Sequence, residues 1–341
     1  MSKIKKLALA GNILLAGLTI LAYLSRVVNP ETSGWISMLG LVYSALVLGH
    51  VFFFFGWLTL SSKKYAFISA LFLLLEFCVF NSWFQISIVS DTHTETTITV
   101  GTLNLQFAKS LSTQPSNTHD QYLNLTKELE KLDILCVQEL GDFNIRYINF
   151  PYRHIPYGEH VGIYSNHPIL NRGTVSSTFN SANNCLWVDI LYQEDTIRVY
   201  SAHLESNRHD GLVPTFVDQT KEEDRTTAGY SGLLTHYLKF SKLRKDQAID
   251  IRANQKSSTH PFLIAGDFND VPLSAVYTNI SAGLKDTFVE KGMGSGSTLS
   301  GVIPGLRIDY ILTSQDWEVM DHDIMKETYS DHYLVTAKLA L

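Results

Sequence analysis

The chain has 341 residues, enough for one large domain and a smaller unit beside it. Apolar residues make up 45% of it, and the longest apolar runs lie in the first ninety residues. From residue 97 onward it carries 21 basic and 29 acidic residues, which argues against a domain that binds nucleic acid mainly through phosphates. The three cysteines show no CxxC spacing, which argues against a disulfide framework or a zinc site, and we expect them to be packing residues.

Three apolar segments come first, at about residues 7–24, 36–60 and 66–84. Each is long enough to cross a hydrocarbon layer of about 30 Å. We therefore predict a membrane anchor of three transmembrane helices over residues 1–90. A cleaved signal peptide is the alternative for the first segment, which has a basic start. That segment lacks a small-residue cleavage site, however, and two more apolar segments follow it.

Basic residues predict the orientation of the anchor. Lys3, Lys5 and Lys6 precede the first segment, and Lys63 and Lys64 separate the second from the third. The stretch after the third segment has no Lys or Arg. By the positive-inside rule, the N-terminus and the turn between the second and third helices face the cytoplasm. Three spans then place the rest of the chain outside the cytoplasm.

One ionisable residue, Glu76, lies near the middle of the third segment. Such a group is expensive inside a membrane and is often functional. In an antiparallel hairpin, His50 of the second segment would lie at about the same depth. We expect a Glu76–His50 pair that holds these two helices together, in preference to a role in transport.

Beyond residue 97 the pattern changes to short strands and polar loops, with helices expected at about 119–131 and 233–256. Six strand-like runs each carry, mostly at one end, a residue that can bind a metal, a proton or a phosphate. A polar residue at a strand end is usually part of a turn, but six in order favour one shared site on a rim of the fold. The runs are 98–103, 132–137, 197–202, 262–265, 307–312 and 333–339.

The motifs at these strand ends resemble those of the endonuclease/exonuclease/phosphatase superfamily. They are LNL at 103–105, QE at 138–139, HLES at 203–206, GDFND at 266–270, RIDYIL at 307–312 and SDH at 330–332. The resemblance covers residues 97–341 and implies a four-layer α/β sandwich, with two mixed sheets packed face to face and helices outside. We therefore expect a catalytic domain over residues 91–341.

The resemblance also implies the ligands of a metal ion. Glu139 would be the principal ligand of Mg²⁺ or Mn²⁺, helped by Asn104 and Asp331. Hard oxygen ligands suit these ions. A metal that neutralises the phosphate, an activated water and a donor to the transferring group are what phosphoester hydrolysis needs.

Five further residues receive catalytic roles from the resemblance. Asp267 would orient or deprotonate the attacking water, and Asn269 would hold a phosphate oxygen. His332, with its tautomer fixed by Asp309, would bind the phosphate or shuttle a proton. His203 lies where deoxyribonuclease-like and sphingomyelinase-like members carry a histidine that is thought to protonate the leaving oxygen, which favours cleavage of a phosphodiester.

Three segments are less decisive. The stretch GSGSTLSG predicts a flexible loop at the site rim, and Leu299 stands there where many relatives have an aromatic residue, which puts base stacking in doubt. The long polar loop 205–232 is expected to recognise substrate or act as a lid, with disorder as the alternative. Residues 239–255 carry many charges and predict a solvated outer helix.

Together these patterns predict a membrane-anchored, metal-dependent phosphodiesterase on the extracytoplasmic side, which uses an activated water for in-line attack. Its expected partners are the lipid bilayer, through the N-terminal helices, and a phosphodiester substrate, either a phospholipid head group or a nucleic acid. No protein partner is evident from the sequence. An extracytoplasmic nuclease is the alternative. A catalytically inactive membrane scaffold ranks last, because the motif residues are intact.

Overall fold

Two six-stranded sheets form the centre of the α/β part of the chain. The first, called the β2 sheet, contains β13 (Glu318–Met325), β14 (Leu334–Ala340), β2 (Ile98–Asn104), β3 (Ile134–Gln138), β5 (Gly162–Ser165) and β4 (Tyr152–His154), in that spatial order. The second, called the β8 sheet, contains β10 (Lys285–Asp286), β12 (Asp309–Thr313), β9 (Phe262–Asp267), β8 (Asp195–His203), β7 (Cys185–Tyr192) and β6 (Ile169–Thr174). Each sheet has one parallel pair, β2–β3 or β8–β9, among antiparallel neighbours, so both sheets are mixed as expected.

The structure is a computed structural model, and its layers follow from the apolar residues on the two faces of each sheet. Ile98 and Ile134 of the β2 sheet pack with Val199 and Leu263 of the β8 sheet in the largest core. Burial of this apolar surface is the main stabilising contribution to the sandwich. The described residues are 2–60, 62–80, 83–87, 96–106, 118–140, 149–158, 160–176, 183–206, 227–301, 305–327 and 329–341.

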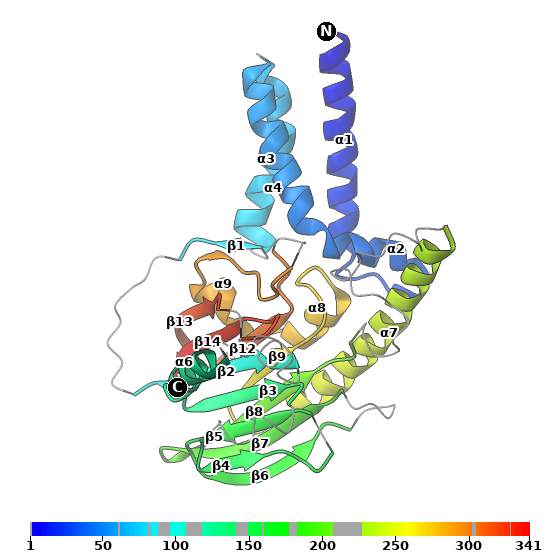
Figure 1. The fold of residues 1–341 in the computed structure, drawn as a ribbon. Helices are drawn as coiled ribbons and strands as arrows, with labels where there is room; N and C mark the ends of the chain where they lie inside the picture. Colours follow the sequence, from blue (N-terminus) through cyan, green and yellow to red (C-terminus); the bar gives the residue numbers. More distant parts are fainter. Residues whose placement is uncertain are drawn as a thin grey trace.

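Helices cover the outer faces of both sheets, which gives the predicted four layers (Figure 1). Helix α6 (Thr118–Leu129) packs through Leu125 and Leu129 on the β2 sheet. Helices α7 (Thr227–Ser257) and α8 (Ala275–Ser281) cover the β8 sheet. The two expected helices are α6 and α7, and the six expected strand runs are β2, β3, β8, β9, β12 and β14. Two short helices, α8 and α9 (Thr287–Lys291), were not expected.

Two of the three cysteines are packing residues. Cys136 is buried in the core between the sheets, and Cys185 in the core beneath α7 and α8. The prediction is wrong for Cys78, which is exposed on the N-terminal helices.

The N-terminal segment forms a bundle that stands on one edge of the sandwich (Figure 1). Its helices α1 (Lys3–Leu24), α3 (Tyr43–Thr59) and α4 (Ala66–Leu75) contact one another, and a π-helical turn, Glu76–Phe80, continues α4. A single 3₁₀ turn, η1 (Lys63–Tyr65), precedes α4. Helix α2 (Pro30–Leu41) lies at the base of the bundle, beside the α/β layers.

The prediction of three membrane-spanning helices is wrong. Among the described residues, only α1 is by itself long and apolar enough to span a membrane. The predicted span 36–60 is divided between α2 and α3, which meet at 53° and pass the same test only as a bent pair. The predicted span 66–84 is helical only as far as Phe80 in the described part. Hydropathy counts apolar residues, but it does not show which of them pack on another part of the same protein.

His50 and Glu76 have separate partners, so the expected pair is also wrong. The two ring nitrogens of His50 lie 3.0 Å from Thr19 Oγ1 and 3.3 Å from Ser69 Oγ. Glu76 accepts a hydrogen bond of 2.6 Å from the hydroxyl of Tyr43. All of these side chains are buried, so polar contacts at two levels hold the helices of the bundle together.

Helix α2 joins the bundle to the α/β layers by lying on α7. The hydroxyl of Tyr237 donates to the carbonyl of Ser37 at 3.4 Å, and Lys242 forms an ion pair with Glu31. Gly34 allows a close approach, because a Cβ there would lie 1.7 Å from a methyl carbon of Leu238. Part of the second apolar run therefore packs on protein.

Two loops of the α/β layers complete this joint. In the first loop, the Leu273 carbonyl accepts a hydrogen bond from Ser25 Oγ. In the second, β11 (Gly294–Ser295) pairs with β1 (Phe84–Gln85), the strand that follows the bundle, and the N–H of Gly296 donates to the carbonyl of Trp83 at 3.0 Å. The bundle is thus attached to the loop after β9 and to the loop before β12.

Candidate active site

Strand pairing brings the predicted residues to one edge of the sandwich. Asn104 is the register partner of Gln138 in the parallel pair β2–β3, and His203 is the partner of Asp267 in the pair β8–β9. Asp309 faces Asp267 from the antiparallel neighbour, β12. The side chain of Asn104 reaches across to the other sheet, where its Nδ2 donates to Asp267 Oδ2 at 3.0 Å.

Gln138 connects the two sheets directly below this edge. Its side chain contacts Thr102 Oγ1 at 3.3 Å within the β2 sheet, and it donates to Ser201 Oγ of β8 at 3.4 Å. All three residues are buried. The Gln of the QE motif is therefore structural in this arrangement, and the Glu that follows it lies at the site.

Glu139 follows β3 with a left-handed backbone, at φ 48°. A residue other than glycine in this region costs on the order of 1–3 kcal/mol and occurs most often at functional sites. Its Oε1 accepts a hydrogen bond of 3.4 Å from Asn104 Nδ2 and lies 3.8 Å from His203 Nε2. The strained turn thus points a carboxylate at the edge where the two sheets meet.

His332 and Asp309 form a buried pair. Nδ1 of His332 lies 3.0 and 3.1 Å from the two carboxylate oxygens of Asp309, which fixes a proton on that nitrogen. Nε2 points to Asp267, with Oδ2 at 3.8 Å. Burial lowers the pKa of His332, but the charges of Asp309 and Asp267 outweigh it and raise the pKa to about 10. The ring is therefore a cation at neutral pH and can donate to an anion from Nε2.

Asp267 is buried at the centre of the site. Burial and the nearby charge of Asp309 raise its pKa to about 6, against the opposing effect of His332 and His203. Its Oδ1 accepts a hydrogen bond of 2.8 Å from the backbone of Asn269. A carboxylate with a pKa in this range is suited to accept a proton near neutral pH.

The approach of β8 to β9 requires Gly266. Its φ is 150°, and a Cβ at this position would lie 1.9 Å from the carbonyl oxygen of Ala202. No side chain fits there. The glycine of GDFND therefore allows the strand that ends in Asp267 to lie beside the strand that ends in His203.

The two acids of GDFND have different surroundings. Asp267 faces the site, whereas Asp270 is buried against Arg244 of α7, with Nε of Arg244 at 3.2 Å. Between them, Asn269 has a φ of 51° and donates from Nδ2 to the Leu204 carbonyl at 2.9 Å. An amide has two hydrogens, so Asn269 retains one for another acceptor, and its phosphate-binding role stays a prediction.

Asp331 lies at the rim, beside a residue that we did not predict. Gln106 donates from Nε2 to Asp331 Oδ2 at 3.1 Å and from its backbone N–H to Asn104 Oδ1 at 3.0 Å. Its φ of 47° is also left-handed. Gln106 thus links two predicted metal ligands. The sequence feature that could have indicated Gln106 is its position as a polar residue two places after Asn104, which ends a strand.

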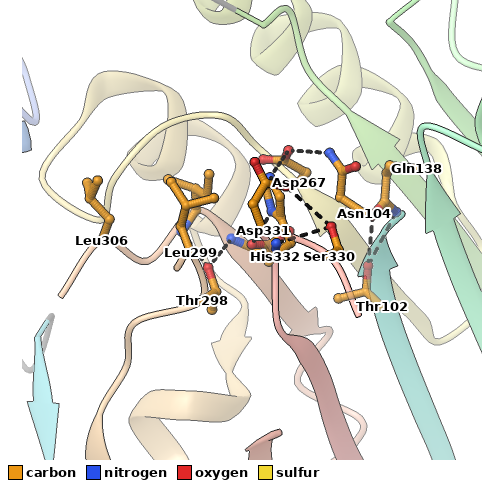
Figure 2. Close-up of polar contacts among 12 residues, drawn as sticks. Thr102, Asn104, Gln138, Asp267, Thr298, Leu299, Leu306, Ser330, Asp331 and His332 are labelled. Carbon is orange, nitrogen blue, oxygen red and sulfur yellow. Dashed lines mark hydrogen bonds and ion pairs between the residues drawn. The ribbon is translucent and has the colours of Figure 1, made fainter. Parts of the chain in front are cut away.

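Thr298 is a second residue that we did not predict. Its Oγ1 accepts hydrogen bonds from the backbone of Ile308 at 3.0 Å and of Asp309 at 3.1 Å. The next residue, Leu299, forms a β-bridge with His332, and Figure 2 shows Thr298, Leu299 and Leu306 on one side of the polar cluster. Because Thr298 is completely buried, this part of the glycine-rich segment is a fixed support, and our prediction of a flexible loop is wrong here.

The long loop 205–232 is only partly described. Glu205 and Ser206 are buried directly after β8, and α7 begins at Thr227. The predicted lid therefore begins with buried residues that follow β8 and ends within helix α7. The rest of the segment lies outside the described residues.

Sequence comparison identifies the family of this arrangement. The model of the Endonuclease/Exonuclease/phosphatase family matches residues 101–332, which include all eight predicted site residues. The chain belongs to this family. A second family model, a domain of unknown function, matches residues 5–83, which correspond to the bundle and its joint. No curated protein matches the chain.

Solved structures of this family share the fold. An endonuclease/exonuclease/phosphatase from Bacteroides vulgatus is 16% identical, with a TM-score of 0.54, over 72% of this chain and 100% of that one. TDP2 from D. rerio, complexed with a single strand DNA product, is 15% identical, with a TM-score of 0.53, over 72% of this chain and 100% of that one. A family protein from Bacteroides thetaiotaomicron is 16% identical, with a TM-score of 0.52, over 72% of this chain and 98% of that one. At these identities the likeness shows the fold alone.

The side chains of the site fit the divalent metal that members of the Endonuclease/Exonuclease/phosphatase family use. Glu139, Asn104 and Asp331 offer the oxygen atoms that Mg²⁺ and Mn²⁺ prefer. Within the described residues, the basic side chains within 4.0 Å of Glu139 and Asp267 are the imidazoles of His203 and His332. A divalent cation beside Glu139 would balance the remaining negative charge and neutralise a bound phosphate.

A second group of possible ligands is also present. One ligand atom each from Asp267, Asp309 and His332 lie within 4.8 Å of one another. Both oxygens of Asp309 contact the ring of His332, however, which fits the predicted orientation of the ring by Asp309, and that role stays a prediction. The assignment of the metal to Glu139, Asn104 and Asp331 stays a prediction.

Proposed function

We propose that this protein is a membrane-anchored, divalent-metal-dependent phosphodiesterase. The observation that carries the proposal is the meeting of Glu139, Asp267 and the Asp309–His332 pair at one edge, with His203 beside them. A buried carboxylate with a raised pKa next to a cationic histidine is typical of acid–base chemistry.

Each residue has a step in the proposed hydrolysis. Asp267 orients the attacking water and takes its proton. His332 donates from Nε2 to an oxygen of the phosphate, while Asp309 holds the ring. His203, whose Nε2 is 4.0 Å from Asp267 Oδ2, protonates the leaving oxygen. Glu139, with Asn104 and Asp331, would hold the metal ion, which would supply positive charge to neutralise the phosphate.

The anchor of the proposed enzyme is the N-terminal bundle. Helix α1 has only 17% of its most apolar window buried, so its apolar side chains face outward, unlike those of a core helix. Leu7 of α1, Phe52 of α3 and Phe67 of α4 are 77%, 73% and 75% exposed. Contact with the acyl chains of a bilayer would remove these surfaces from water.

The position of the lysines supports an extracytoplasmic catalytic domain. The N-terminus lies at the end of the bundle remote from the α/β layers (Figure 1), and η1, with Lys63 and Lys64, connects α3 to α4 at the same end. Placing these lysines in the cytoplasm puts the other end of α1 outside. Since α3 and α4 return as a hairpin, the catalytic domain stays on the outer side whether or not that hairpin crosses the whole bilayer.

The joint favours a phospholipid head group as the substrate. The loop that follows Asp267 and the loop that contains Thr298 are the loops attached to the bundle, and Leu273 and Leu306 line a small cavity between the bundle and the α/β layers together with Trp83. A lipid held in the same bilayer would present its phosphate close to this rim. The acidic balance of the domain and Leu299 count against a nucleic acid.

The alternative substrate is DNA or RNA, and a specific comparison favours it. The D. rerio TDP2 structure holds a single strand DNA product on the same fold. An extracytoplasmic nuclease would use the same residues in the same steps.

Hydrolysis by the full chain in detergent tests the proposal. Bis(4-nitrophenyl) phosphate is a substrate that favours neither lipid nor nucleic acid. We expect cleavage that requires Mg²⁺ or Mn²⁺ and falls by roughly a hundredfold or more in Asp267→Asn. Asp195→Asn, an exposed acid at the far end of β8, is the matched control and should keep the wild-type rate. A folded protein that binds Mn²⁺ but cleaves nothing would contradict the proposal and favour the scaffold.

Phospholipid vesicles and plasmid DNA then separate the two substrate classes. Release of the phosphorylated head group, with no nicking of DNA, supports the lipid. Nicking without release of head group would establish the nuclease instead.

A further inference from the structure

Helix α7 contains a buried cation where the sequence predicts a solvated helix. The side chain of Arg244 has no exposed surface, although its neighbours Lys242 and Ile249 face solvent. A charged side chain is almost never fully buried without partners that hold it. The partners of Arg244 therefore indicate what the buried charge does.

The guanidinium of Arg244 bridges the two loops that follow the proposed proton-transfer groups. Its Nε donates to Asp270 Oδ2 at 3.2 Å, and NH1 donates to the carbonyl of Glu205 at 3.1 Å. Asp270 lies three residues after Asp267, and Glu205 lies two residues after His203. One side chain thus ties the loop after β9 to the loop after β8.

Further contacts fix the Glu205 end of this bridge. Gln247, on the turn after Arg244, accepts from the N–H of Glu205 at 2.8 Å and donates to the carbonyl of Asn183 at 2.7 Å. The amide of Asn183 in turn donates to the carbonyl of Leu204 at 3.0 Å. The loop after β8 is therefore held by α7 on both sides of Glu205.

The Asp270 end is fixed as firmly. Asp270 Oδ1 accepts from the N–H of Val271 at 3.0 Å, and the hydroxyl of Tyr310 donates to the carbonyl of Asp270 at 2.9 Å. The preceding residue, Asn269, is in the left-handed region, a conformation that persists only where the surroundings enforce it. Asn269 joins the two loops directly through the Leu204 carbonyl, and Arg244 joins them a second time from α7.

We propose that Arg244 is a positioning residue for the hydrolysis. It does not touch the reacting atoms. Together with the β8–β9 pairing and the Asn269–Leu204 hydrogen bond, it holds the 4.0 Å between His203 Nε2 and Asp267 Oδ2, on which the transfer of a proton to the leaving oxygen depends. This inference rests on the proposed function, because it assigns a task within that reaction.

If Arg244 and Asp270 only stabilise the fold, replacing both of them should restore both stability and kcat. If Arg244 also positions the loops, the double replacement should restore stability alone. An apolar pair of similar volume usually preserves stability in place of a buried ion pair, whereas removal of one partner leaves an uncompensated charge. Directed hydrogen bonds to two loops have no apolar substitute. Measuring both Tm and kcat therefore distinguishes a stabilising ion pair from a positioning residue.

The experiment compares Arg244→Met, Asp270→Leu and the double variant in the full chain in detergent, with bis(4-nitrophenyl) phosphate as substrate. We expect both single variants to lower Tm, and the double variant to recover most of it. In the double variant kcat should stay at least about tenfold below the wild type with little change in KM. Recovery of kcat together with Tm would overturn the proposal. Lys256→Met, an exposed residue on the same helix, is the control.

Arg244→Lys gives a second test that does not depend on the double variant folding. Lysine keeps the charge, but its single ammonium does not match the fork of the guanidinium. We expect kcat to fall about tenfold while the Mg²⁺ concentration for half-maximal activity stays constant. A wild-type kcat would overturn the inference about Arg244 and leave the proposed function intact. An inactive wild type would refute both.

Discussion

Replacing Thr298 by valine removes one oxygen atom and leaves the shape of the side chain almost unchanged. That oxygen accepts hydrogen bonds from the backbone of Ile308 and Asp309, at 3.0 and 3.1 Å. Thr298 is completely buried, so water does not replace the lost acceptor. A buried donor without a partner costs about 1–3 kcal/mol. For two donors, with some relaxation, we expect the free energy of unfolding to fall by about 2–4 kcal/mol.

The same substitution should also slow the reaction. The N–H of Asp309 loses its anchor, and Asp309 is the residue that orients His332. We expect kcat to fall by about tenfold or more, with a smaller effect on KM.

Urea unfolding of the full chain in detergent measures the change in stability, with the fluorescence of the tryptophans, among them the buried Trp317, as the signal. Thr298→Ser is the control. It keeps the hydroxyl and loses one methyl group, which should cost about 1 kcal/mol. Valine at this position with a free energy of unfolding within about 0.5 kcal/mol of the wild type would refute the assigned role of the hydroxyl.

Three further predictions follow from single residues. Gly266→Ala places a Cβ 1.9 Å from the carbonyl of Ala202, so we expect it to prevent folding or to lower Tm sharply, and a wild-type melting curve would contradict the strand geometry. Burial lowers the pKa of His322 from 6.5 to about 4, so the folded state favours the neutral ring. The neutral ring contributes fully to the free energy of unfolding above pH 6.5. This free energy falls by about 3 kcal/mol in all as the pH drops toward 4. Urea titrations at about pH 7 and pH 5 should therefore differ less for His322→Asn than for the wild type, and equal differences would refute this cause. Gln106→Ala should raise the Mg²⁺ concentration for half-maximal activity, because Asp331 loses a donor that orients it, and an unchanged metal dependence would remove Gln106 from the site.

The strands that build the site could be predicted because their signals are local. An apolar run that ends in Asn104, His203 or Asp267 can be recognised from the local sequence alone. The order of the motifs along the chain carries the family resemblance. The resemblance also implies two mixed sheets, within which the structure pairs β2 with β3 and β8 with β9 in parallel. The catalytic edge was therefore predictable before its distances were known.

The residues that support the site could not be predicted in the same way. Thr298 and Gln106 act through contacts with segments distant in sequence, and their own neighbourhoods resemble ordinary loops. Arg244 lies among the charges of α7, and the helical pattern gives no sign that it faces inward. The same limit explains the error at 36–60, where apolar residues serve two different surfaces.

The joint between the bundle and the α/β layers connects segments that lie far apart in the sequence. Ser25 contacts Leu273, which lies 248 residues later in the sequence. Strand β1 can pair with β11 only after residues 294–295 have been synthesised. During synthesis the N-terminal helices emerge first, and contacts over such separations close late. We therefore expect the loop that contains Thr298 to dock on a bundle that has already formed, and the proposed catalytic edge to be among the last parts of the molecule to fold.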